Sequence, residues 1–189
     1  MTTLDTLRDA LPDYARDLKL NLGSVLSPTG APGLNERQIW AVALGAAEAS
    51  RNPAFAAAIG DLATAHLDAA YQTAARAAAA IMGMNNVYYR FLHLVDDPEY
   101  GRMPARLRMN VIANPGIDKV DFELVSLAVS AINGCGTCVA SHERQIRQHG
   151  LPREAVQSAV RIAATVHAAA RVLDNVGWAV AVRGTRAAA

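Results

Sequence analysis

Residues 124–152 read LVSLAVSAINGCGTCVASHERQIRQHGLP and divide at Asn133-Gly134. The nine residues before this pair are apolar or small, and the residues after it mix apolar and charged side chains. Asn and Gly favour the left-handed conformation that ends a helix, and Gly and Pro near residue 150 are further stop signals. The stretch therefore predicts two helices joined by a tight turn, with Cys135 and Cys138 at the start of the second.

Helical spacing extends over the rest of the 189-residue chain. Alanine is abundant, β-branched residues rarely alternate with polar ones, and apolar residues recur every three or four positions, as at Leu4, Leu7 and Leu11. This pattern is typical of helices that pack on one another. We predict an all-α helical bundle that forms a single domain over residues 1–189.

Capping and turn residues give the expected helix boundaries. Pro12 should interrupt a first helical segment over residues 3–20. Further along the chain, the pattern predicts a loop at 27–33, helices that start at Asn35 and at Asn52 or Pro53, a helical region over 61–92 broken at 83–86, loops at 96–104 and 114–118, a helix that Asp118 or Asp121 opens, and a last helix over 153–176. The Ala-rich tail after Arg183 is expected to fray.

A short internal similarity suggests two related helical units. AIMGM at 80–84 matches AINGC at 131–135, each after an Ala-rich helical stretch. The 51-residue offset would make Met84 the equivalent of Cys135, and Gln72 the equivalent of Glu123. Chance similarity in an Ala-rich chain is the other explanation.

Charge and hydropathy exclude several classes of protein. The chain has 18 basic and 17 acidic residues, a net charge of +1, which argues against a nucleic-acid-binding face. The longest uncharged run, 124–141, contains seven Ser, Thr, Asn or Gly residues, so a buried helix pair is favoured over a membrane span. The sequence opens without the pattern of a secretory signal, and we expect a cytoplasmic, reducing compartment. There a C-x-x-C pair is more often catalytic or metal-binding than structural.

The two cysteines and a histidine lie within eight residues. In the first turn of a helix, free N–H groups and the helix dipole favour a thiolate. Cys138 and His142 are four residues apart and share a helix face, so the imidazole can activate the sulfur. Cys135 is near enough to trap an oxidised Cys138 as a disulfide.

Glu123 is the candidate third member. If the chain reverses at Asn133-Gly134, Glu123 lies roughly 15 Å from the turn along one helix and His142 roughly 10 Å along the other. A glutamate side chain can bridge this difference to the imidazole, but not to the cysteines. We expect Glu123 to orient His142, which takes the proton from Cys138 directly or through a water.

Other interpretations remain open at this point. The cysteines could form half of a zinc site, although a structural site needs four ligands and the other histidines lack ligand spacing. They could form a purely structural disulfide, although so short a loop gains little stability. His142 could be a partly exposed helix histidine without a function, and Glu123 could only complement the helix dipole.

Three stretches of the sequence carry a family resemblance. AIMGMNNVYYR (80–90), RMNVIANPGIDKVDFELVSLAVSAINGC (108–135) and the C-x-x-C-x-x-x-H motif resemble the alkyl hydroperoxidase D family, in the carboxymuconolactone-decarboxylase-like all-α superfamily. The resemblance implies that Cys138 is the nucleophile that passes through a sulfenic acid. It implies that Cys135 donates a proton and then closes a Cys135–Cys138 disulfide, with His142 as base and Glu123 in the proton relay. One branch of that family has a histidine between the cysteines, where this chain has Gly136 and Thr137.

The resemblance also implies partners. Members form homotrimers, reduce peroxides and regenerate a partner peroxiredoxin, the C component. Their electrons come from dihydrolipoamide on a lipoylated dihydrolipoamide acyltransferase, which dihydrolipoamide dehydrogenase recharges. We expect no bound cofactor and no metal, because no G-x-G-x-x-G follows a strand and dithiol exchange needs no cofactor.

The sequence therefore predicts an antioxidant, lipoyl-dependent alkyl hydroperoxide reductase. The alternatives are a general thiol–disulfide oxidoreductase without peroxide specificity, a ring-opening or decarboxylating enzyme of the same superfamily, and a non-enzymatic zinc or redox-sensing module.

Overall fold

The computed structural model describes residues 2–177, and these residues form helices and loops without a β-strand. The elements are α1 (Leu4–Asp9), the 3-10 helix η1 (Asp13–Ala15), α2 (Arg16–Val25), α3 (Glu36–Ala49), α4 (Pro53–Ala63), α5 (Ala69–Leu94), α6 (Pro98–Arg102), α7 (Asn110–Ala113), α8 (Lys119–Asn133), α9 (Gly136–Gln148) and α10 (Arg153–Asn175). The predicted all-α class is confirmed. The tail after Arg183 lies outside the described residues.

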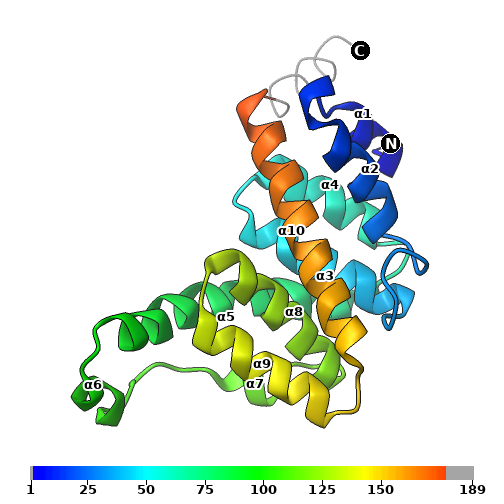
Figure 1. The fold of residues 1–189 in the computed structure, drawn as a ribbon. Coiled ribbons are helices and arrows are strands. Elements are labelled where there is room, and N and C mark those ends of the chain that lie inside the picture. The colour runs from blue at the N-terminus through cyan, green and yellow to red at the C-terminus, as the bar shows by residue number, and fades with distance from the viewer. Residues whose placement is uncertain (1, 178–189) are drawn as a thin grey trace.

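Two helices form the centre of the bundle. In α3 the ten residues 38–47 are buried, and in α8 the ten residues 121–130 are buried. A helix that is buried all round must be covered on every side. Accordingly, α8 packs against α3, α5, α9 and α10, and Figure 1 shows α10 crossing the bundle beside α2 and α3. The site helix α9 is thus supported by one of the two central, buried helices.

The order of helices repeats along the chain. The helices α3, α4 and α5 start at residues 36, 53 and 69, and α8, α9 and α10 start at 119, 136 and 153, which is 83, 83 and 84 residues later. The buried segments 38–47 and 121–130 differ by the same 83 residues. At the start of these segments the two units meet, where Gln38 Nε2 donates to Asp121 Oδ1 at 2.7 Å.

The predicted 51-residue offset of this repeat is wrong. Residues 80–84 lie inside α5, whereas 131–135 contain the end of α8 and the turn that follows. Met84 is therefore not the equivalent of Cys135, and Gln72 is not the equivalent of Glu123. With the 83-residue offset, the positions equivalent to Cys135 and Cys138 hold Asn52 and Phe55.

Most predicted boundaries are confirmed by the caps. Asn35 forms a capping box with Gln38, Asn52 caps α4, and Asp118 caps α8 through a bond from the Val120 N–H. Pro12 separates α1 from η1. Short polar side chains at these positions accept from the free N–H groups of the first turn.

Two boundaries were predicted wrongly. The chain breaks between α4 and α5, at residues 64–68, and then runs unbroken through 83–86. Inside a helix, Gly83 costs only about 1 kcal/mol, and the buried Asn86 is bonded to Ser130 of α8, so packing overrides the local preference. The predicted loop at 96–104 contains the short helix α6, which Asp97 caps.

One segment leaves the bundle. The end of α5, α6 and the extended chain after it form an arm that projects from the helical body, and α6 lies at its tip (Figure 1). The arm returns to the body at α7. In residues 2–177, no helix combines the length and the apolar character needed to cross a membrane.

Candidate active site

The turn between α8 and α9 fixes the cysteines. Gly134 adopts the left-handed conformation (φ 70°), its N–H donates to Ala131 O, and the Cys135 N–H donates to Ser130 O at 3.1 Å. This is the Schellman arrangement, in which glycine is favoured because it has no Cβ. It ends α8 and makes Cys135 the N-cap of α9. The predicted helix–turn–helix is confirmed.

Cys135 and Cys138 are joined by a disulfide. The Cys138 N–H donates to Cys135 Sγ at 3.3 Å, so the first sulfur acts as the capping acceptor of α9. The side chain of Cys135 is fully buried, whereas Cys138 keeps 6% of its surface exposed and lines a cavity. Only the second sulfur of the pair is therefore open to a reactant.

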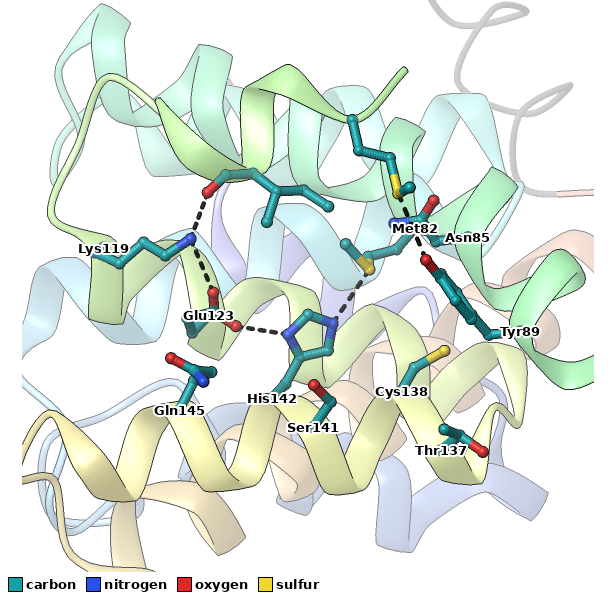
Figure 2. Close-up of a pocket in the computed structure, with 12 residues that line it drawn as sticks. Met82, Asn85, Tyr89, Lys119, Glu123, Thr137, Cys138, Ser141, His142 and Gln145 are labelled. Carbon is teal, nitrogen blue, oxygen red and sulfur yellow. Dashed lines mark hydrogen bonds and ion pairs between the residues drawn. The ribbon is translucent and has the colours of Figure 1, made fainter. Parts of the chain in front are cut away.

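Glu123 and His142 meet as the sequence predicts. The His142 Nδ1–H donates to Glu123 Oε2 at 2.6 Å, across the α8–α9 contact (Figure 2). Because a carboxylate only accepts, the proton lies on Nδ1. Lys119, one turn before Glu123, contacts Glu123 Oε1 at 3.1 Å and also donates to the Ile112 carbonyl. The carboxylate thus bridges a lysine and an imidazole.

The electrostatics keep Glu123 ionised. Burial by itself would raise the pKa of this carboxyl group, which is only 3% exposed, but the hydrogen bond and charge of His142, followed by those of Lys119, outweigh burial. The net result is a pKa below the ordinary value. An ionised Glu123 stabilises the imidazolium that forms when His142 accepts a proton.

The other ring nitrogen of His142 faces sulfur, but not the sulfur of a cysteine. His142 Nε2 lies 3.3 Å from Met82 Sδ, and within the described residues the ring has its hydrogen bonds to Glu123 and Met82. Cys138 points into the same cavity from one turn earlier on α9 (Figure 2). With the ring held in this position, a proton passing from the reduced Cys138 thiol to His142 Nε2 needs a water or a small rotation of the ring.

The cavity in front of Cys138 has a volume of about 450 Å³. Its walls come from α5, α7, α8 and α9 and the chain before α7, and most of its lining is apolar. The lining residues are Met82, Asn85, Tyr89, Met109, Ile112, Lys119, Glu123, Thr137, Cys138, Ser141, His142 and Gln145. Such a volume accommodates a small organic molecule with its reactive end at the sulfur.

Of the residues that line this cavity, the sequence predicted Glu123, Cys138 and His142 as site residues and not the others, among them Met82, Asn85 and Lys119. Asn85 lies in the helix break that the sequence predicts at 83–86. Lys119 was detectable, because it precedes Glu123 by four residues on a predicted helix, the spacing at which side chains meet. Nothing in the sequence distinguished Met82 and Asn85 from packing residues, because their role depends on α5 lying across α9.

The first helical unit has no equivalent of this site. With the 83-residue offset, the positions of Glu123 and His142 hold Trp40 and Ile59. These side chains are buried and carry no acid–base chemistry at neutral pH. Within the described repeat, the reactive set belongs to the second unit alone.

Comparison with known proteins gives the family. The model of the carboxymuconolactone decarboxylase family matches residues 98–181, which include the cysteines, Glu123 and His142. The chain is 56% identical over 172 residues to an alkyl hydroperoxide reductase AhpD of Rhodospirillum centenum, covering 91% of each protein. The chain belongs to the alkyl hydroperoxide reductase AhpD family. Two further AhpD relatives support this assignment. The chain is 55% identical over 172 residues to that of Frankia alni, covering 91% of each protein. It is 56% identical over 171 residues to that of Maricaulis maris, covering 90% of this chain and 97% of the relative. The resemblance predicted from the sequence is confirmed.

Proposed function

We propose that this protein is an antioxidant oxidoreductase that reduces alkyl hydroperoxides with its cysteine pair. The observation that carries the proposal is that Cys138 opens into the cavity that also holds the Glu123–His142 pair, while Cys135 is buried behind it. Because Cys138 is the accessible sulfur, we assign it the attack on the peroxide, and we assign Cys135 the step that closes the disulfide. The names of the family relatives support peroxide as the oxidant.

The oxidative half-reaction uses the reduced pair. His142, oriented by Glu123, takes the proton of Cys138, and the thiolate attacks the terminal oxygen of R–O–O–H. The S–O bond forms as the O–O bond breaks, so the sulfur is oxidised by two electrons and the leaving alkoxide takes a proton that Cys135 donates. The Cys135 thiolate then attacks the sulfenic acid. The S–S bond forms as the S–O bond breaks, and the leaving hydroxide takes the proton held by His142 and departs as water.

The reductive half-reaction follows from the same geometry. A dithiol such as dihydrolipoamide attacks Cys138, the accessible sulfur, and Cys135 leaves as a thiolate. The Cys138 N–H already points at Cys135 Sγ, and the N-terminus of α9 stabilises the charge that forms there. The second thiol of the donor then attacks the mixed disulfide and releases Cys138.

We propose that the donor is dihydrolipoamide on a lipoylated dihydrolipoamide acyltransferase, which dihydrolipoamide dehydrogenase recharges. We further propose that the reduced pair passes electrons to a peroxiredoxin partner, the C component. A long, flexible lipoyl arm suits a sulfur that lines a cavity of about 450 Å³. No resident cofactor is needed, because the electrons travel through disulfides.

We propose a homotrimer, and the projecting arm supports it. Large apolar side chains are exposed along the arm: Phe91 (44%), Leu94 (70%), Tyr100 (40%) and Met103 (58%). A run of exposed apolar residues on one segment is typical of a surface that other chains cover. Analytical ultracentrifugation should give three times the 20.0 kDa chain mass.

The test measures hydroperoxide consumption with dihydrolipoamide or with glutathione as the reductant, each with and without the peroxiredoxin partner. Turnover with dihydrolipoamide that exceeds turnover with glutathione supports the proposal, and Cys138→Ser should abolish it. Disulfide exchange without hydroperoxide turnover would favour the general thiol–disulfide oxidoreductase. Stoichiometric zinc in native mass spectrometry without turnover would favour the zinc module, and activity that survives loss of both thiols would favour a decarboxylase.

A further inference from the structure

Asn85 is a buried polar residue whose side-chain oxygen has no hydrogen-bond partner within residues 2–177. Its side chain lies on α5 and lines the cavity in front of Cys138, and the residue is only 5% exposed. Among the residues that the structure describes, its buried Oδ1 atom has no hydrogen-bond donor. Buried amides are almost always bonded, so an unbonded one at a reactive cavity points to a ligand.

The neighbouring asparagine shows what a structural role looks like on the same helix. Asn86 donates to Ser130 Oγ at 2.9 Å and accepts from Asn133 Nδ2 at 2.9 Å, and so joins α5 to α8. Asn85 makes no such connection to another helix. Among the described residues, a hydrogen bond between helices therefore does not account for the buried Asn85 amide.

Asn85 lies on the wall of the cavity that faces Cys138. Met82, Asn85 and Tyr89 follow one another along the face of α5 that looks onto α9, three and four residues apart. Figure 2 shows Asn85 between Met82 and Tyr89, with Cys138 on the opposite wall. The polar amide thus lies in an otherwise apolar stretch that faces the reacting atom.

We propose that Asn85 binds the –OOH group of the alkyl hydroperoxide and stabilises the leaving oxygen. This inference rests on the proposed function. A side-chain amide carries an acceptor and a donor side by side. The hydroperoxide O–H donates to Oδ1, and the inner oxygen accepts from Nδ2–H. The alkyl group lies against Met82, Tyr89 and Ile112.

The role in the reaction follows from where charge develops. When the Cys138 thiolate takes the terminal oxygen, the O–O electron pair stays on the inner oxygen, which becomes an alkoxide. A donor already bonded to that oxygen stabilises the transition state more than the ground state. The alkoxide then takes the proton that Cys135 donates and leaves as the alcohol.

The test replaces the amide by an apolar side chain of similar volume, Asn85→Leu. We expect kcat/KM for tert-butyl hydroperoxide to fall about 100-fold. The fall should be the same for cumene hydroperoxide, because Asn85 contacts the –OOH group and not the alkyl group. Reduction of the Cys135–Cys138 disulfide by dihydrolipoamide should keep its wild-type rate. The control Gln72→Leu makes the same exchange on α5, at a partly exposed side chain bonded to the Leu67 carbonyl outside the cavity, and should leave peroxide turnover unchanged.

Thermal unfolding distinguishes this role from a structural one, because removing an amide that held the fold together would lower Tm. Because Asn85 Oδ1 has no partner, Asn85→Leu should keep or raise Tm. Wild-type kcat/KM in Asn85→Leu, or a fall that depends on the alkyl group, would overturn the proposal. A lower Tm together with slower disulfide reduction in Asn85→Leu would also overturn the proposal, provided that Asn85→Ala shows the same two losses. Wild-type protein that turns over no hydroperoxide would instead refute the proposed function itself.

Discussion

Replacing Glu123 by glutamine probes the Glu123–His142 pair most directly, because the amide keeps the shape of the side chain and removes its charge. Lys119 only donates, so the glutamine oxygen must face it, and the glutamine NH₂ then faces His142 Nδ1. The imidazole must move its proton to Nε2, the nitrogen that should accept from Cys138. We expect peroxide turnover to fall by at least about 100-fold.

The effect on stability can be worked from the same contacts. The carboxylate is 3% exposed and accepts from His142 at 2.6 Å, and a hydrogen bond to a charged group contributes about 1.5–3 kcal/mol. The ion pair with Lys119, whose side chain is 35% exposed, adds less than about 1 kcal/mol. A loss of about 2 kcal/mol lowers the Tm of a chain of this length by roughly 4–8 °C.

The pH dependence has a definite sign. The pKa of Glu123 is lowered in the folded protein, so its stabilisation is present above the ordinary carboxyl value of 4.5 and is lost as the pH falls through the lower folded value. The Tm difference between wild type and Glu123→Gln should therefore be full at pH 7 and close below pH 4.5. The assay is thermal unfolding by circular dichroism of the oxidised proteins at one concentration. An equal Tm at pH 7, or a gap that stays constant into acid, would refute this electrostatic assignment.

Three further substitutions test the surroundings of the site. Lys119→Met should raise the pKa of Glu123 and lower stability by less than about 1 kcal/mol, with a smaller activity loss than Glu123→Gln; an equal loss would contradict this. Gly45→Ala places a Cβ 2.3 Å from Val125 Cγ1, where α3 crosses α8, and should lower the free energy of unfolding in urea by about 1–3 kcal/mol. Adding Val125→Ala to this variant should recover part of that loss. Losses that simply add in the double variant would argue against the clash. Gly134→Ala, at φ 70° with open space around it, should cost about 1–2 kcal/mol from backbone conformation alone; unchanged stability would mean that another backbone conformation serves there.

Local chemistry made much of the fold predictable. Asn35, Asn52 and Asp118 cap helices through bonds within one turn, and Gly134 ends a helix through its own backbone freedom. These features depend on neighbours in sequence, so a pattern reveals them. The Glu123–His142 contact was also predictable, because a tight turn between two antiparallel helices fixes which residues of one helix lie beside which residues of the other.

Features that depend on distant packing were not predictable in this way. The helix α5 continues through Gly83 because Asn86 bonds to α8, a contact 44 residues away along the chain. The contact of Met82 with His142 joins residues 60 positions apart, and local preferences carry no information about it. The 83-residue repeat shows itself in the order of the helices and in the positions of their buried segments, which only the structure reveals. The short sequence identity between residues 80–84 and 131–135 pointed to a different offset, because residues 80–84 lie inside α5.

The central claim is that Cys138 is the sulfur that meets the peroxide and Cys135 the one that resolves it. The most direct measurement treats reduced Cys135→Ser with one equivalent of tert-butyl hydroperoxide, traps sulfenic acid with dimedone and locates the adduct by mass spectrometry. We expect one dimedone adduct on Cys138, and none on Cys135 in the reciprocal Cys138→Ser protein. An unlabelled Cys138, or an adduct on Cys135 that forms as fast in the reciprocal variant, would contradict the assignment.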